Sequence, residues 1–163
     1  MKGQTMSKLK ELLEEIEPVM RQAFDKFGEI TKPVWFCEDD EGQKGMIFTE
    51  VDDVRDKDTL AEFIKNEFKE RNVVRYVTVM EMWFVSTNEE GYKQNNLPPA
   101  QRDDRKEGVM FHGEDRDTGE KVFKVFEINR SSGKPVLNTE GVIKDFDMAA
   151  GRFVDLFHKP TMN

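Results

Sequence analysis

The sequence predicts a single α+β domain of 163 residues, with a largely antiparallel sheet of about five to six strands and helices packed on it. Three observations support this fold class. Residues 73–87 are rich in strand-forming side chains, two segments show the turn chemistry of hairpins, and two show helical apolar spacing. The predicted order is α-β-β-α-β-β-β-(β)-α, and its mostly short connections favour an antiparallel sheet.

Residues 73–87 read VVRYVTVMEMWFVST, without Gly or Pro. Successive strand residues point to opposite faces, and both alternating sets here are mostly apolar. We therefore expect this strand in the interior of the sheet, with cover on both faces. The first arm of each predicted hairpin is its expected neighbour.

Residues 7–27 have the spacing of an amphipathic helix, with Ser7 as its expected N-cap and Gly28 as its left-handed end. Pro18 either kinks the helix near Glu15 or begins a second helix, and the unbroken apolar stripe favours a kink. We expect the stripe to face the core, although a partner could also bind it. Its members are Leu9, Leu12, Leu13, Ile16, Val19, Met20, Ala23, Phe24 and Phe27.

The next elements are a hairpin and a second helix. Strands are expected at residues 33–37 and 46–51, joined by the turn EDDEGQKG. Asp58 is the expected cap of a helix that continues to about Arg71, and Asn72 can end it in the left-handed region. The apolar face of this helix is expected to consist of Leu60, Phe63, Ile64 and Phe68.

The second half of the chain predicts another hairpin, with strands at residues 109–114 and 121–129 around a turn at 115–119. A short strand is expected within residues 136–146, best at 141–143. Asp147 could cap a last helix over residues 148–157.

Two stretches of the single domain 1–163 read as irregular. Residues 88–108 form a long polar loop, NEEGYKQNNLPPAQRDDRKEG, and loops of this length are commonly functional or disordered. Residues 158–163 are expected to be a frayed tail.

The composition argues against several function classes. The net charge of −8 disfavours direct binding to nucleic acid or to an anionic membrane. The sequence has no continuous apolar run of membrane-spanning length and no signal-peptide pattern at its start, so we expect a cytoplasmic protein. Cys37 is the single cysteine, and we expect it to be a buried thiol.

Recognisable cofactor and metal motifs are not found in the sequence. Phosphate-binding glycine loops and the Gly-x-Ser-x-Gly motif are missing. Cys37, His112 and His158 have no spacing typical of a zinc site. We therefore predict no cofactor and no metal.

The best chemical constellation joins the long strand to the long loop. Glu81 lies mid-strand, two residues before Trp83, and a carboxylate there must be paired, hydrogen-bonded or reached by solvent. We expect Arg102 or Arg105 to pair with Glu81, with His112 on the neighbouring strand. The pair is either a structural ion pair or part of a general acid–base site, and the structural interpretation is favoured.

Three features carry a resemblance: Glu81-Met82-Trp83 at the end of a strand, a polar loop containing prolines, and Asp104-Arg105-Lys106-Glu107 opening the next strand. Over residues 76–128 this resembles a group of small uncharacterised bacterial and phage proteins. The resemblance implies a prokaryotic or phage cytosolic protein. It carries no activity and no catalytic residues.

The function favoured by the sequence is protein binding without catalysis, with self-association as a corollary. The expected surface is the loop 88–108 together with Trp83, Tyr92, Arg102 and Arg105, because aromatic and Arg side chains commonly anchor interfaces.

Two rival functions stay open. An acidic decoy that mimics nucleic acid would need its carboxylates on one face. A small hydrolase would use carboxylates, with or without Mg²⁺ bound through them. The candidate residues of the hydrolase are Glu81, Asp103, Asp104, Glu107 and His112.

Overall fold

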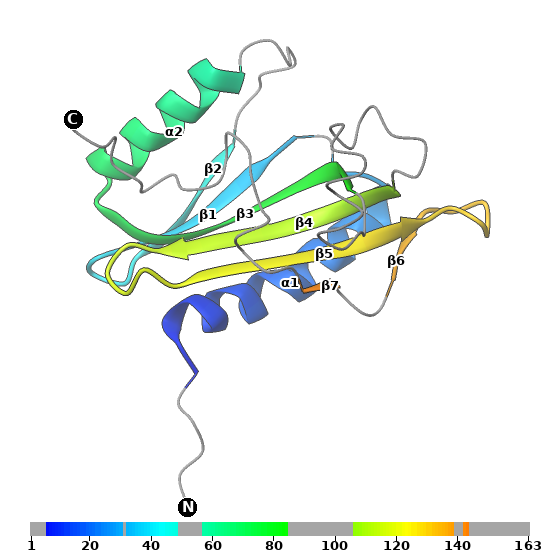
Figure 1. The fold of residues 1–163 in the computed structure, drawn as a ribbon, viewed down its shortest axis with the longest axis horizontal. Coiled ribbons are helices and arrows are strands. Elements are labelled where there is room, and N and C mark those ends of the chain that lie inside the picture. Colours follow the sequence, from blue (N-terminus) through cyan, green and yellow to red (C-terminus); the bar gives the residue numbers. More distant parts are fainter. Residues whose placement is uncertain (1–5, 31, 49–56, 85–105, 139–141, 144–163) are drawn as a thin grey trace, which may run out of the picture.

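The computed structural model describes residues 6–30, 32–48, 57–84, 106–138 and 142–143. They form an α+β domain with an antiparallel sheet, as the sequence predicts (Figure 1). Its elements are α1 (Lys8–Phe27), β1 (Val34–Asp39), β2 (Lys44–Phe48), α2 (Lys57–Glu70), β3 (Val73–Phe84), β4 (Lys106–Asp115), β5 (Lys121–Asn129), β6 (Val136–Leu137) and β7 (Val142–Ile143).

The strand order is β2-β1-β3-β4-β5-β6, and β7 also pairs with β5. The long strand β3 is therefore interior, and its neighbours β1 and β4 are the first arms of the two hairpins, as predicted. Both pairings are antiparallel, with Val77 opposite Phe36 on one side and Gly113 on the other. The predicted end of this strand, residues 85–87, lies outside the described residues.

Helix α1 begins and ends as its sequence indicates. The Ser7 hydroxyl accepts a hydrogen bond from the Lys10 N–H at 3.2 Å, and Gly28 ends the helix at φ +76°. The helix continues through Pro18, so the alternative prediction of a second helix that starts at Pro18 is wrong. The predicted stripe is mostly buried, but Val19 and Phe27 are 56% and 68% exposed, because the sheet covers a narrower face than the stripe.

Helix α2 begins at Lys57, so Asp58 lies inside its first turn and is not its N-cap, which corrects that prediction. Asn72 adopts φ +54° as expected. Three of the four expected apolar positions are buried: Leu60, Ile64 and Phe68. Phe63 is 47% exposed, which corrects the prediction for that side chain.

One helix covers each face of the sheet (Figure 1). The α1 face buries residues such as Val77, Val79 and Phe111, while the α2 face buries Trp35 and Tyr76. Both sides of β3 are thus enclosed, and this explains why its two alternating sets are apolar. Neither described helix is long and apolar enough to cross a membrane.

The end of the chain is only partly described. The predicted strand region contains two short strands, β6 and β7, and both pair with β5. The predicted helix 148–157 and tail 158–163 lie outside the described residues, as do residues 88–105 of the loop. The last three residues of that loop, 106–108, belong to β4.

Gly113 lies on β4 beneath Leu9 of α1, where there is no room for a side chain. A Cβ atom at this position would lie 2.7 Å from the Tyr76 carbonyl oxygen and 3.1 Å from Leu9 Cδ1. We expect Gly113→Ala to lower the free energy of unfolding by about 1–3 kcal/mol, because a backbone atom must move. Urea unfolding would measure this loss. Gly45→Ala is the matched control, since nothing lies within 4 Å there, and equal effects of the two substitutions would contradict the packing.

Candidate functional site

Glu81 lies on the α1 face of β3, where its carboxylate accepts a hydrogen bond from the Ile30 N–H just beyond α1. Burial raises the pKa of Glu81 above its ordinary value. The hydrogen bond from Ile30 opposes this shift, whereas the nearby charge of Glu29 adds to it. A half-buried carboxyl of this kind can hold a proton at a higher pH than a surface carboxyl.

His112 lies on the opposite face of the sheet from Glu81. Glu81 is opposite Val109, and His112 is three residues further along β4, so its side chain points to the other side. The His112 ring is fully buried, 5.9 Å from the ring of Tyr76 and 6.3 Å from that of Phe123. The two candidates are on neighbouring strands, as expected, but they do not share a site.

Glu107 is brought near Glu81 but is already paired. It binds Arg130 at 2.5 Å, and its charge helps to raise the pKa of Glu81 while Arg130 lowers it. Glu107 stands opposite Trp83 in the β3–β4 register. The other predicted site residues lie outside the described part of the chain, so their pairing with Glu81 stays a prediction; they are Tyr92, Arg102, Asp103, Asp104 and Arg105.

The raised pKa of Glu81 predicts a pH-dependent stability. A carboxyl whose pKa is higher in the folded state destabilises the fold once it ionises, so the wild type loses stability as the pH rises through the interval between the unfolded and folded values. We expect Glu81→Gln to be free of this loss, so its stability relative to wild type should be greater at pH 7 than at pH 4. An NMR titration that finds an ordinary pKa for Glu81 would contradict this.

Metal and thiol chemistry find little support in the described residues. No group of three or more His, Cys, Asp or Glu among them could hold a metal ion. Burial raises the pKa of the Cys37 thiol to about 12, with a smaller opposing effect of Arg71. A thiol with such a pKa is a poor nucleophile at neutral pH.

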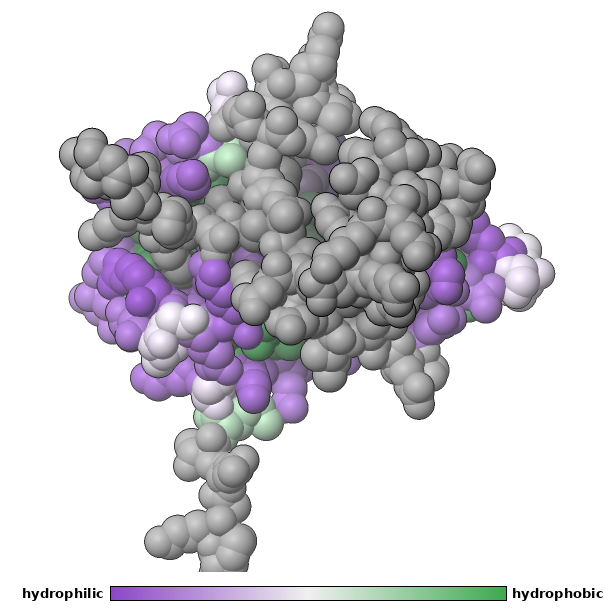
Figure 2. Space-filling view, viewed as in Figure 1, coloured by the Kyte–Doolittle hydropathy of each residue, from purple (hydrophilic) through white to green (hydrophobic). Residues whose placement is uncertain are grey.

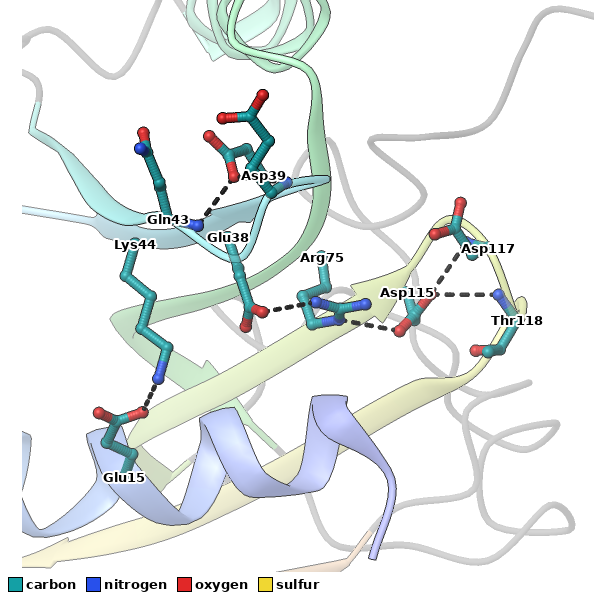
Figure 3. A network of polar contacts seen from close by, with 10 residues as sticks. Glu15, Glu38, Asp39, Gln43, Lys44, Arg75, Asp115, Asp117 and Thr118 are labelled. Carbon is teal, nitrogen blue, oxygen red and sulfur yellow. Dashed lines mark hydrogen bonds and ion pairs between the residues drawn. The ribbon is translucent and has the colours of Figure 1, made fainter.

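A buried ion network ties three strands together (Figure 3). Arg75 on β3 lies 2.8 Å from Glu38 on β1 and 3.0 Å from Asp115 on β4. Burial alone would raise the pKa of Asp115, but the hydrogen bond from Arg75 and those from the N–H groups of Thr118 and Asp117 bring it below its usual value. Asp115 also accepts hydrogen bonds within the β4–β5 turn, so the network stabilises this turn. The charges of Arg75, Glu38 and Asp115 are paired with one another.

The strand β2 forms the edge of the sheet and pairs with β1 alone among the described strands. In the hairpin turn, the Asp39 N–H donates to the Gln43 carbonyl at 2.9 Å, which makes these two residues a hydrogen-bonded pair. Because such pairs alternate along an antiparallel ladder, Gly45 and Ile47 also bond to β1. The peptide groups of the other β2 residues point away from the sheet; these residues are Lys44, Met46 and Phe48.

Apolar side chains gather beside this edge. Met46 is 43% exposed and Phe48 67% exposed, and Val19 of α1 is nearby. Val19 and Met46 line a groove of about 340 Å³ between α1 and the β1–β2 hairpin, and Phe48 is two residues further along β2. The groove is lined by Leu12, Glu15, Ile16, Val19, Phe36, Cys37, Lys44, Gly45 and Met46.

Charged residues frame the groove. Lys44 binds Glu15 of α1 at 2.7 Å across it (Figure 3). A polar hollow of about 240 Å³ shares Leu12 and Lys44 with the groove and is also lined by Lys8 and Glu11. Elsewhere, on the face seen in Figure 2, hydrophilic residues dominate the described surface.

Comparisons with protein-family models, with curated proteins and with solved structures find no match to this chain. The site therefore has to be judged from its own geometry. Sequence reasoning missed the β2 edge, although the alternation of Met46 and Phe48 on one side of a short strand was visible.

Proposed function

We propose that the chain is a non-enzymatic protein-binding domain of the cytoplasm, and that it binds through the edge of β2. The observation that supports this is an edge strand with outward peptide groups at Lys44, Met46 and Phe48, beside an apolar groove. An extended segment can add to such an edge through main-chain hydrogen bonds, while the groove selects its side chains. Direct binding of nucleic acid or membrane is not expected at a net charge of −8.

A random linear-peptide library, panned at nanomolar concentration of the immobilised chain, tests this proposal. Met46→Pro is the decisive variant. The N–H of Met46 points outward, so proline removes an outward donor and leaves the hydrogen bonds between β2 and β1 in place. We expect peptides to be enriched on the wild type and on Phe27→Ser but not on Met46→Pro. No enrichment, or equal enrichment on Met46→Pro, would overturn the β2 edge as a binding surface.

The loop surface favoured by the sequence is kept as a second part of the proposal. The binding surface would then extend to residues 88–108 with Trp83, Tyr92, Arg102 and Arg105. The end of this stretch, including Glu107, belongs to β4. Alanine substitution of Trp83 or Tyr92 in the same panning experiment should weaken binding at least tenfold if they are anchors. Unchanged binding would limit the surface to β2.

The carboxylate-dependent hydrolase is the second candidate function, and the raised pKa of Glu81 is the observation that favours it. A thermal-shift scan with Mg²⁺ and Mn²⁺ separates it from a binding domain, since an ion that binds the folded state raises the melting temperature. A shift that disappears in Glu81→Gln would support the hydrolase. No shift would count against a metal-dependent enzyme.

A nucleic-acid mimic ranks last. It needs uncompensated carboxylates on one face, whereas Glu15, Glu17 and Glu107 are paired with Lys44, Lys124 and Arg130, respectively. These pairs interleave positive charge with negative charge on the described surface.

A further inference from the structure

The β2 edge is complementary to itself, and the register centred on Met46 is the one that pairs all three outward positions, 44, 46 and 48. In an antiparallel pairing of two β2 strands about a two-fold axis at Met46, each Met46 faces its counterpart and Lys44 of one copy faces Phe48 of the other. All three positions turn their peptide groups outward, so each facing pair can exchange two main-chain hydrogen bonds. A shift of this register by one residue would set outward groups against inward ones.

The same register places an exposed aromatic ring over the groove. Phe48 is opposite Val34, and Met46 is opposite Phe36, so both side chains lie on the α1 face of the sheet. Lys44, Gly45 and Met46 line the groove. A Phe48 ring from a second copy would therefore lie above Lys44, at the groove opening, and the two-fold axis makes this contact reciprocal.

The chemistry at these contacts is also compatible. The Lys44 ammonium can lie over the partner Phe48 ring as a cation–π pair, and it remains beside Glu15 at 2.7 Å. Gly45 has open space where a Cβ would be, opposite the partner's larger Ile47. Small and large residues thus face each other across the pairing.

We infer that the occupant of the β2 edge is a second copy of this chain, in antiparallel β2–β2 pairing centred on Met46, with Phe48 of each copy at the groove of the other. This rests on the proposed function and names its partner. The edge and its few apolar side chains make an interface on the order of 1,000 Å², the size of a weak or transient contact. The charge of −8 on each copy opposes association, so the dimer should strengthen with added salt.

Sedimentation equilibrium from 1 to 200 µM, at low and high salt, tests the inference with the intact chain. We expect the mass to rise from 19.0 kDa towards twice that value. Met46→Pro and Phe48→Ser should stay monomeric. Phe27→Ser is the matched control, because Phe27 is 68% and Phe48 67% exposed, and it should still associate.

A cross-linking experiment tests the register itself. In this pairing the two Met46 Cα atoms would be about 5.5 Å apart, within disulfide range. Met46→Cys should form an interchain disulfide on mild oxidation, whereas Lys44→Cys should not. Cys37 will not compete, since it is buried and the pKa of its thiol is about 12.

The outcomes separate the two proposals. A wild-type chain that is monomeric at every concentration, with no Met46→Cys cross-link, overturns the second copy as the occupant. So does a dimer that persists in both Met46→Pro and Phe48→Ser. Peptide binding that depends on Met46 would leave the proposed function standing in either case. The absence of both peptide binding and a Met46-dependent dimer would remove both proposals.

Discussion

Arg75→Met is expected to lower the free energy of unfolding by about 3–5 kcal/mol. The Arg75 side chain is 7% exposed, and its partners Glu38 and Asp115 are 14% and 3% exposed. Removing the guanidinium leaves two carboxylates in the protein interior without their counter-charge, and this costs far more than a surface ion pair contributes. Chemical denaturation at pH 7 would measure the loss.

Arg71→Met is the matched control for Arg75. Arg71 binds Glu67 at 3.1 Å, but its side chain is 48% exposed, so its loss should cost no more than about 1 kcal/mol. Combining Arg75→Met with Glu38→Met and Asp115→Asn should recover more than half of the loss, because the stranded charges are removed. A loss below about 1 kcal/mol for Arg75→Met alone would show that the network is not buried as described.

Phe24→Ala is the second large effect, also about 3–5 kcal/mol. Phe24 is fully buried where α1 packs on the sheet, and its truncation leaves a cavity in the larger of the two cores. For a chain of this size the melting temperature should fall by about 10 °C. Calorimetry of Phe24→Ala and the wild type would measure the fall.

Phe27→Ala, three residues further along α1, supplies the comparison. Phe27 is 68% exposed, so its truncation should change stability by less than about 0.5 kcal/mol. The sequence alone places both residues on one apolar stripe and predicts similar effects. Equal losses for the two variants would therefore contradict the orientation of α1 on the sheet.

The parts of the fold predicted correctly are those encoded in local patterns. The two apolar sets of residues 73–87 predicted the interior strand β3, and the turns at 115–119 and 38–45 predicted both hairpins, although the strands β1 and β2 extend into the second of these turns. The Ser7 cap and the left-handed Gly28 fixed both ends of α1. In each case a few neighbouring residues carry the physical cause.

The parts predicted wrongly depend on contacts between distant segments. The α1 stripe cannot show where the sheet ends, so Val19 and Phe27 were expected to be buried. Helix α2 starts two residues earlier than a cap at Asp58 predicts, a difference that is common at helix ends. The resemblance to bacterial and phage proteins stays a prediction.

The candidate site follows the same rule. Glu81 was found because a carboxylate in an apolar strand is a local anomaly, and the structure shows it half-buried. Its relation to His112 depends on the β3–β4 register, which the sequence of the intervening loop does not reveal. The edge position of β2 depends likewise on the order of strands in the sheet.

Residue-resolved amide hydrogen exchange along β2, at low and high chain concentration, is the most direct test of association through this edge. In the dilute chain, Gly45 and Ile47 should be protected, while Lys44, Met46 and Phe48 exchange quickly. At high concentration the last three amides should become protected as well. Fast exchange at all five amides, or protection of the outward three that does not change with concentration, would contradict the account.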